Sequence, residues 1–232
     1  MGQAEDDNRL GPRIDAHPAP RPQRVTLRGR AVTVAPLTSE HAAPLYQSSS
    51  GPGREQLWTY LFNGPFSDLE QFAADVETKS KAADPLYFAV LDNRDGRAIG
   101  YQSLMRIDPA NRVIEVGGIM YTPLLQGTAG STEAQYLFAK YVFDDLGYRR
   151  YEWKCNDRNA PSRRAALRLG FTFEGVFRQH MIIKSRNRDT AWFSMLDHEW
   201  PARRQAFENW LDPANFDAEG RQKRRLEEFV AL

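Results

Sequence analysis

The alternation of apolar and polar positions predicts β-strands through the first half of the chain. The segment 25–37 alternates in this way and predicts a strand or a hairpin. Three further segments have strand-like composition: 86–93, 97–108 and 112–122. An Asp-Gly pair joins the first two of these and is typical of a hairpin turn. Two helices are expected in the same half, one beginning at Ser39 and one over 68–83.

A helical repeat is clearest in the middle of the chain. Apolar residues recur there at i, i+3, i+4, i+7 and i+8 and would form one face: Ala134, Leu137, Phe138, Tyr141 and Val142. Gly147 predicts the end of this helix, because glycine readily adopts the left-handed conformation that ends many helices. The remaining elements are expected as a strand at 149–156, a helix at 159–170, antiparallel strands at 171–184 and 189–200, and helical stretches at about 202–211 and 218–230. This order predicts an α+β fold with one mixed sheet.

Length and composition predict one domain with two terminal additions. The 232 residues are 41% hydrophobic, which is enough for one substantial core. Residues 1–23 are polar and rich in proline, so we expect a disordered N-terminal tail. A folded domain over 24–200 and a C-terminal helical extension over 201–232 would make up the rest.

Charge and cysteine content disfavour several classes of protein. The net charge of +1 gives no general attraction to nucleic acid or to anionic membranes. The single cysteine, Cys155, excludes an internal disulfide and multi-cysteine metal sites, which fits a reducing compartment. No apolar run approaches the roughly 18–20 residues of a membrane span, and the N-terminus has no apolar signal core. We therefore expect a cytoplasmic protein.

A loop of small residues connects the strand at 112–122 to the central helix. It consists of Gly127, Thr128, Ala129, Gly130 and Ser131. A helix N-terminus attracts phosphate through its unpaired N–H groups and its dipole, and small residues let the ligand approach the backbone. Thr132 and Gln135 form a T-x-x-Q pattern, which predicts a capping box at the helix start. From the loop alone, an ordinary strand-to-helix turn is the simpler interpretation.

The residues that follow this helix favour the phosphate-binding interpretation. Asn159, Ser162 and the segment LRLGF (167–171) come after it in this order, and Asn159 is the expected cap of the helix at 159–170. Together these blocks resemble the GNAT superfamily of acyl-CoA-dependent N-acetyltransferases, and more closely the branch that includes the ribosomal-protein alanine acetyltransferases. The resemblance covers about 25–200 and is densest over 132–178. It implies a GNAT-type mixed, mostly antiparallel sheet flanked by helices, with a splayed central pair of parallel strands.

The resemblance also implies acetyl-CoA as co-substrate, with no metal. Gln126 matches the first position of the superfamily's loop pattern, Arg/Gln-x-x-Gly-x-Gly/Ala, whereas Ala129 and Ser131 depart from its fourth and sixth positions. These departures bring the affinity for CoA into question. Cofactor contacts are assigned by resemblance to the strand end Ile119, Met120 and Tyr121, to the loop residues Gln126, Gly127, Thr128, Ala129, Gly130, Ser131 and Thr132, and to Asn159 and Ser162. A bulge at Gly117-Gly118 would favour the splay, and Arg163 or Arg164 would either reach the 3′-phosphate or remain solvated.

The implied reaction is direct attack of a primary amine on the thioester in a ternary complex. Glu115 is the first candidate for the general base, because some members of the superfamily carry a catalytic glutamate at this spacing; an ion pair on the strand is the alternative. Some ribosomal-protein-modifying relatives use a glutamate where this chain has Met181, so the adjacent His180 is the second candidate. An α-amino acceptor, with a reference pKa of about 7.7–8.0, would need little help from a base.

Ser162 is the candidate hydrogen-bond donor to the leaving thiolate. Many superfamily members place a tyrosine where this chain has Ala166, and Ser162 lies one turn earlier on the same helix face. The ribosomal-protein branch has a serine there, although a first-turn role in capping backbone amides is the alternative. Cys155 has no patterned His-Asp partner and is expected to be a small buried residue.

The acceptor and the partners are less constrained. Trp58, Tyr60 and Phe62 would form either an aromatic wall for the acceptor or a hydrophobic cover over the core. The acceptor would be a protein N-terminus or a small amino compound. The departures from the family pattern leave a non-catalytic acyl-CoA-binding or protein-interaction module as the alternative. The arginine-rich segment 220–232 suggests either nucleic-acid contact or, given its acidic residues, a packing or homodimer helix.

Overall fold

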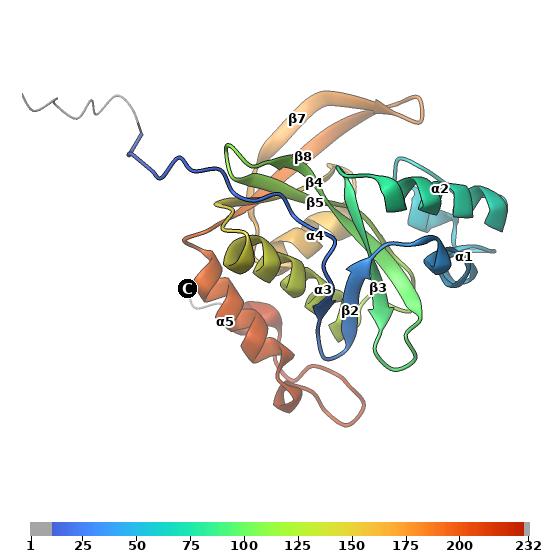
Figure 1. The fold of residues 1–232 in the computed structure, drawn as a ribbon. Helices are drawn as coiled ribbons and strands as arrows, with labels where there is room; N and C mark the ends of the chain where they lie inside the picture. The colour runs from blue at the N-terminus through green and yellow to red at the C-terminus, as the bar shows by residue number, and fades with distance from the viewer. Residues whose placement is uncertain (1–10, 230–232) are drawn as a thin grey trace, which may run out of the picture.

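A computed structural model gives the fold of residues 11–229, in which one sheet is flanked by helices (Figure 1). The strands are β1 (Leu27–Arg28), β2 (Val32–Pro36), β3 (Leu86–Asp92), β4 (Ala98–Asp108), β5 (Val113–Tyr121), β6 (Arg150–Asn156), β7 (Thr172–Ile183) and β8 (Arg186–Leu196). The α-helices are α1 (Ala42–Ser49), α2 (Leu69–Lys81), α3 (Ala129–Lys140), α4 (Ala160–Arg168) and α5 (Trp200–Leu211). The segment predicted as a strand or a hairpin at 25–37 is the β1–β2 hairpin.

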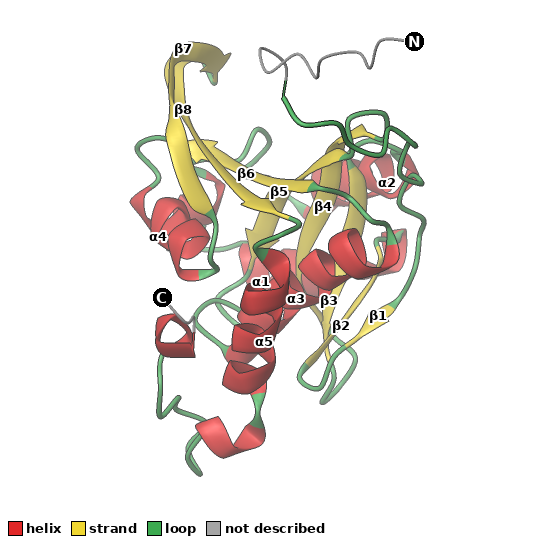
Figure 2. Cartoon of the chain, turned by 90° about the vertical axis from the view of Figure 1, so that its left-hand side faces the viewer, coloured by secondary structure: helices red, strands yellow, loops and turns green. Residues whose placement is uncertain are grey.

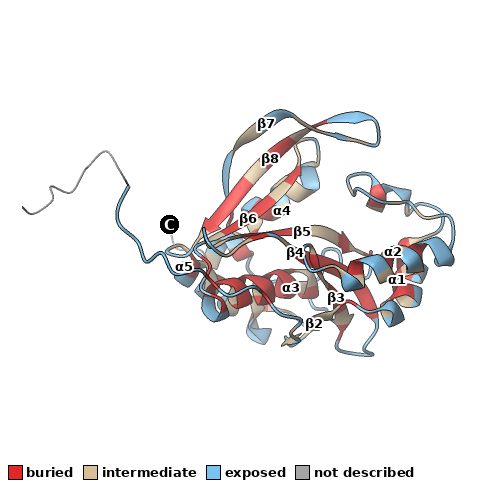
Figure 3. Ribbon diagram, turned by 45° about the horizontal axis from the view of Figure 1, so that its top comes forward, coloured by how far each residue is buried: buried red, intermediate tan, exposed pale blue. Residues whose placement is uncertain are grey.

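The sheet has the strand order β1-β2-β3-β4-β5-β6-β8-β7. All neighbouring strands pair antiparallel except β5 and β6, which are parallel. The predicted mixed, mostly antiparallel sheet with a central parallel pair is therefore confirmed. The β7–β8 hairpin stands away from the rest of the sheet (Figures 1 and 2), and its tip is exposed (Figure 3).

Helices cover both faces of the sheet because successive side chains of a strand point to opposite faces. Phe88 on β3 packs against Phe138 of α3, with ring centroids 5.2 Å apart, and belongs to the core that α3 and α5 cover. The next residue, Ala89, belongs to a second core, which contains Leu45 of α1 and Phe72 of α2. Alternation along one strand thus separates two cores and fixes which helices lie on each face.

A buried carboxylate fixes α3 against the β1–β2 hairpin. Glu133 is 5% exposed and accepts hydrogen bonds from the backbone N–H groups of Arg30 (2.8 Å), Ala31 (2.7 Å) and Val32 (2.9 Å). A side chain at Gly29 would overlap this carboxylate, since a Cβ there would lie 2.5 Å from Glu133. These bonds satisfy an otherwise buried charge and set the position of the helix whose N-terminus borders the site.

A bulge on β5 separates the half that pairs with both β4 and β6 from the half that pairs with β4 alone. Ser103 pairs with Gly117 and Tyr101 with Met120, so β5 carries one extra residue here. Gly118 has a φ of +58°, a left-handed conformation that glycine adopts without strain. The predicted bulge at Gly117-Gly118 is therefore present.

The chain termini differ from the predictions in two ways. Residues 11–23 contain no helix or strand, but Ala19 is 8% exposed and its N–H bonds to the carbonyl of Pro109 at 3.0 Å, so this part of the tail packs on the core. The helix predicted at 218–230 is wrong over the described part. The Asp217 carboxylate accepts the N–H groups of Glu219 and Arg221, which forms a turn, and only the short 3₁₀ segment Leu226–Phe229 follows. The predicted disorder of residues 1–10 lies outside the described residues.

Candidate active site

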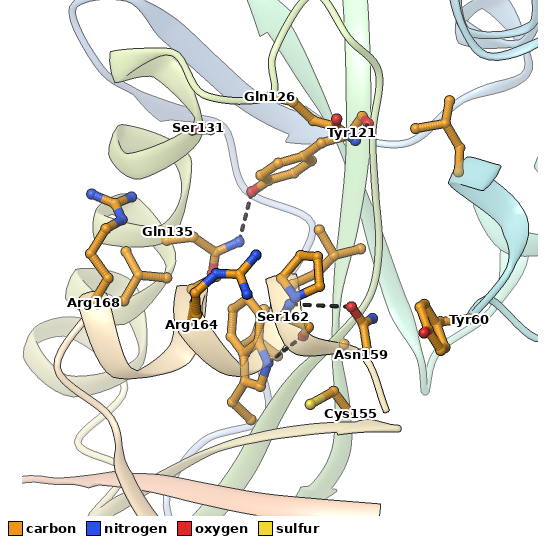
Figure 4. A pocket seen from close by; sticks show the side chains of 18 of the residues that line it. Tyr60, Tyr121, Gln126, Ser131, Gln135, Cys155, Asn159, Ser162, Arg164 and Arg168 are labelled. Atoms are coloured by element: carbon orange, nitrogen blue, oxygen red, sulfur yellow. Dashed lines mark hydrogen bonds between the residues drawn. The ribbon is translucent and has the colours of Figure 1, made fainter. Parts of the chain in front are cut away.

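One cleft of about 1870 Å³ collects most of the predicted site residues (Figure 4). It runs from the loop before α3, past the ends of β5 and β6 and the first turn of α4, to the segment around Tyr60. The predicted residues that line it are Tyr60, Phe62, Glu115, Ile119, Tyr121, Gln126, Gly127, Thr128, Ala129, Ser131, Thr132, Asn159 and Ser162. Trp58, Met120 and Gly130 do not line it.

The loop before α3 presents backbone to the cleft. Gly127 has a φ of +71°, and a Cβ there would meet no other atom, so glycine is needed for the turn rather than for space. Thr128 precedes the helix in an extended conformation, and Ala129 is the first helical residue. Gln126 fixes the loop by donating to the Tyr121 carbonyl at 2.8 Å. Because Ala129 is helical, its methyl group introduces no left-handed strain.

The predicted capping box at Thr132 and Gln135 is wrong, because α3 begins three residues earlier. Thr132 lies in the helix, and its hydroxyl accepts a hydrogen bond from Arg168 at 2.6 Å. Gln135 donates to the Gln102 side chain at 2.8 Å and to the Tyr121 hydroxyl at 2.6 Å. The unpaired N–H groups of the first turn therefore belong to the segment beginning at Ala129.

Two residues of the predicted cofactor contacts point away from the cleft. A Cβ on Gly130 would lie 2.8 Å from Val32, so this glycine permits close packing of α3 on β2. Met120 is 2% exposed, and its side chain belongs to the core under α1 and α2, leaving only its backbone toward the parallel strand. The side chains of Ile119 and Tyr121, one residue to either side, line the cleft.

The parallel pair splays where the cleft passes between the two strands. β5 and β6 pair from Val113 with Arg150 to Val116 with Trp153, and no pairing follows. From Gly117 onward, the edge of β5 that faces β6 has no strand partner among residues 11–229. Free N–H and C=O groups on this edge can bind an extended ligand. The predicted splay is confirmed.

Ser162 occupies the first turn of α4, beside the open end of β6. Asn159 caps this helix by accepting the Ser162 N–H at 3.2 Å, as predicted. The Ser162 hydroxyl oxygen accepts the Trp153 indole N–H at 3.0 Å. Cys155 is 4% exposed, and burial raises the pKa of its thiol, partly offset by a hydrogen bond with Ser162. With an indole donor on its oxygen, Ser162 can donate its own hydroxyl hydrogen to a sulfur acceptor, either the Cys155 thiol or another sulfur in the cleft.

Glu115 lies in the paired part of β5, one residue before its pairing with β6 ends, in a cluster of charges. Its carboxylate is 3.0 Å from the Lys154 ammonium and 3.1 Å from the Arg106 guanidinium, and Lys154 also contacts Glu152 at 2.6 Å. Burial raises the pKa of Glu115, opposed by Lys154 and Arg106. The ion pair that was the alternative interpretation is present, and the carboxylate also borders the cleft.

His180, the second candidate base, lies at the cleft, but only some of the other candidate residues do. His180 borders the cleft, and one ring nitrogen lies 2.9 Å from the Thr190 hydroxyl. Arg164 lines the cleft, whereas Arg163 forms an ion pair with Asp157 and does not. Ala166 is fully buried in the core and lies outside the cleft.

The segment around Tyr60 closes the cleft at the end away from the loop before α3. The Tyr60 hydroxyl donates to the Arg158 carbonyl at 3.0 Å, and Lys184 at the β7–β8 tip donates to the carbonyls of Trp58 (2.9 Å) and Gly64 (2.8 Å). The Trp58 ring is 2% exposed and packs against Phe66, so Trp58 belongs to the hydrophobic cover rather than to the acceptor wall.

Sequence reasoning missed three contributors to the cleft. Arg188 on β8 lines the end near Phe62, and Gln135 lines the wall from within α3. Trp210, near the end of α5, and Arg221, beyond that helix, border the end near the loop before α3. A glutamine among the apolar positions of α3 was the available signal for Gln135. Arg188 and the C-terminal residues come from distant segments, and their spacing gave no signal.

The family follows from comparison with known proteins. The family described as Acetyltransferase (GNAT) domain matches residues 31–172. The chain belongs to this GNAT acetyltransferase family. The predicted resemblance is therefore confirmed, and with it the general class of N-acetyltransferases.

Individual proteins named as N-acetyltransferases are similar to this chain at different levels of sequence identity. A GCN5-related N-acetyltransferase structure from Brucella melitensis is 52% identical, with a TM-score of 0.92, over 94% of this chain and 99% of that one. The N-acetyltransferase p20 of Bacillus licheniformis is 27% identical over 75% of this chain and 98% of its own length. A Bacillus subtilis protein named as a ribosomal N-acetyltransferase, YdaF, is 29% identical over 106 residues, but this match spans only 57% of that protein. Such a name belongs to the branch that the sequence resembles.

Two searches for other site types gave no candidate within residues 11–229. No group of three or more His, Cys, Asp or Glu side chains in this range is placed to hold a metal ion. None of the helices in this range combines the length and apolar character that crossing a bilayer requires.

Proposed function

We propose that this GNAT protein transfers the acetyl group of acetyl-CoA to a primary amine by direct attack in a ternary complex. The observation that carries the proposal is the continuity of the cleft. One cavity joins the loop at Gln126, the open edge of β5, Ser162 and Glu115. A donor with a phosphate end, an extended arm and a thioester end matches this sequence of features.

The residues that would hold the donor fit its chemistry. The N–H groups at the start of α3 and the turn at Gly127 suit the pyrophosphate, and Arg164 and Arg168 border the same region of the cleft. The unpaired edge of β5 beside Ile119 suits the amide groups of the arm. Acetyl-CoA would supply an activated carbonyl carbon and a thiolate leaving group.

Ser162 is proposed as the donor to the leaving sulfur. As the amine nitrogen bonds to the carbonyl carbon, the C–S bond breaks and its electron pair goes to sulfur. The Ser162 hydroxyl, polarised by Trp153, then stabilises that negative charge. Holding the thioester and the amine together supplies much of the remaining rate enhancement.

Glu115 is proposed as the acceptor of the amine proton. Burial raises the pKa of its carboxyl group, which makes it a better proton acceptor at neutral pH. Lys154 and Arg106 keep the carboxylate ionised and oriented before the amine transfers its proton. An acceptor with a low amine pKa would depend less on Glu115.

A measurement of acetyl-CoA binding distinguishes the proposed enzyme from a protein that has lost the ability to bind CoA. Calorimetric titration should show saturable binding, and a thermal-shift assay at about 100 times the Kd should show about 2.7 kcal/mol of stabilisation. Thiol release with a panel of primary amines then tests turnover. Binding without turnover on any amine would favour a non-catalytic acyl-CoA-binding module, and no binding at millimolar acetyl-CoA would contradict the proposal.

A further inference from the structure

Arg188 is a buried cation at the acceptor end of the cleft. It lies on β8 opposite Met181 of β7, and the whole residue is only 9% exposed. Its guanidinium carbon is 5.0 Å from the centre of the Phe62 ring, and one terminal nitrogen is 3.8 Å from the Met181 sulfur. The side chain therefore sits beneath the segment that closes the cleft.

This guanidinium has no carboxylate partner among residues 11–229. No Asp or Glu oxygen in that range lies within 4.0 Å of it, and its buried Nε has no hydrogen-bond partner. The nearby cations Arg106 and Lys154 differ, because both contact Glu115. Burial lowers the pKa of Arg188; Cys155 and Glu115 favour its charged form without forming an ion pair with it, and Arg106 opposes them.

An unpaired buried charge is costly, and a bound anion would offset that cost. Transfer of a charged group out of water is strongly unfavourable unless a partner and hydrogen bonds replace the lost solvation. A guanidinium presents parallel N–H groups that match the two oxygens of a carboxylate. The cleft as a whole favours anions, because seven basic and two acidic residues line it: Arg54, Arg106, Lys154, Arg164, Arg168, Arg188 and Arg221 against Glu115 and Glu227.

We propose that Arg188 binds a carboxylate of the acceptor, so that the acceptor class is amines that carry a carboxylate close to the amino group. This inference rests on the proposed acetyl transfer and specifies its second substrate. The free α-carboxylate of an amino acid and the acidic side chain of a residue next to a peptide N-terminus share this chemistry.

A purely structural role for Arg188 makes different predictions. The contact with Phe62 would then hold the closing segment, and removing the guanidinium would weaken all acceptors equally. Recognition of a carboxylate instead changes the ratio between an acid and its neutral amide. The ratio is therefore the quantity to measure.

The test compares matched acceptors on the full chain. One pair is an L-amino acid and its carboxamide, and the other is a short peptide with Asp or Asn at its second position. Each would be assayed for kcat/KM by thiol release with wild type, Arg188→Gln, Arg188→Lys and the control Arg186→Gln. Arg186 lies on the same strand, is exposed and does not line the cleft.

We expect wild type to prefer the acid of at least one pair by about 10- to 100-fold. Arg188→Gln should reduce this preference to about onefold, Arg188→Lys should retain part of it, and Arg186→Gln should leave it unchanged, all with the KM for acetyl-CoA unaltered. Which pair responds identifies the source of the carboxylate. Turnover without preference in either pair, or a preference that survives in Arg188→Gln, would overturn the inference alone. No turnover of any amine would instead count against the proposed function.

Discussion

The indole N–H of Trp153 donates a 3.0 Å hydrogen bond to the hydroxyl oxygen of Ser162 across the open end of the parallel strand pair. This contact joins the last residue of β6 that pairs with β5 to the first turn of α4. The serine hydroxyl lines the cleft in which a thiolate would form, beside the Cys155 thiol.

Replacing Ser162 tests its role as donor to the leaving sulfur. Ser162→Ala should lower kcat by about 100-fold with little change in the KM for acetyl-CoA, because only the developing negative charge is left without a donor. Trp153→Phe should lower kcat less and cost about 1 kcal/mol of stability from the lost hydrogen bond. Ser80→Ala is the control, since that hydroxyl donates to the Glu77 carbonyl at 2.8 Å and does not line the cleft. Equal kcat in wild type and Ser162→Ala would rule out this role.

The loop before α3 should tolerate one glycine–alanine exchange but not the other. Gly127→Ala places a side chain at a φ of +71° and should cost about 1–2 kcal/mol while weakening acetyl-CoA binding. Ala129→Gly restores the family residue at a helical position and should change the Kd by less than about threefold, because its methyl introduces no strain. Thermal unfolding and calorimetry measure both effects. A large gain in affinity for Ala129→Gly would show that the methyl obstructs the donor.

The pH dependence of turnover should report Glu115. Its pKa is raised by burial, so kcat/KM should fall as the pH drops through an apparent pKa above the ordinary value for glutamate. The folded state binds this proton more tightly than the unfolded state. The associated stability is therefore present at low pH and is lost as the pH rises through the folded-state pKa.

Glu115→Gln should remove both dependences and lower kcat for a lysine-like amine more than for an α-amine. His180→Gln is the matched control for the other candidate base. If the acidic limb of the profile persists in Glu115→Gln and disappears in His180→Gln, the assignment of the base reverses.

The Cys155 thiol should react slowly with thiol reagents and should not be needed for turnover. It is 4% exposed, and burial raises the pKa of its thiol, so little reactive thiolate exists at neutral pH. A thiol reagent should label the native protein far more slowly than the unfolded protein, and saturating CoA should slow labelling further because Cys155 lines the cleft. Cys155→Ala should retain kcat within about threefold. Loss of turnover in that variant would indicate a covalent role for the thiol.

The sequence predicts the framework of the fold because the framework depends on local patterns. The apolar repeat that includes Phe138 defines α3, and Gly117 and Gly118 mark a bulge that the structure contains. Gly147 follows the π-helical segment Tyr141–Asp145, which continues α3 and ends where the glycine predicts. Asn159 was recognised as a cap because capping needs only residues within one turn. The linked blocks around the loop and LRLGF fixed the family.

Features that depend on tertiary contacts were not predictable in this way. The T-x-x-Q pattern at Thr132 looks like a cap, but Thr132 bonds to Arg168 and Gln135 to Tyr121, both from other elements. The segment after Gly220 has helical composition, yet the Asp217 carboxylate holds a turn there. Arg188 can be recognised as a candidate anion-binding residue only from the structure, which shows that it is buried and has no carboxylate partner within residues 11–229.

The central claim is direct transfer of acetyl from acetyl-CoA to an amine, and mass spectrometry of a single-turnover reaction tests it most directly. The protein would be mixed with less than one equivalent of acetyl-CoA, with and without a carboxylate-bearing amine. The molecular masses of the protein and of the amine would then be measured. We predict an acetylated amine and free CoA only when the amine is present, with the protein mass unchanged throughout. An acetylated protein formed before the amine is added, or CoA release without an acetylated amine, would contradict the account.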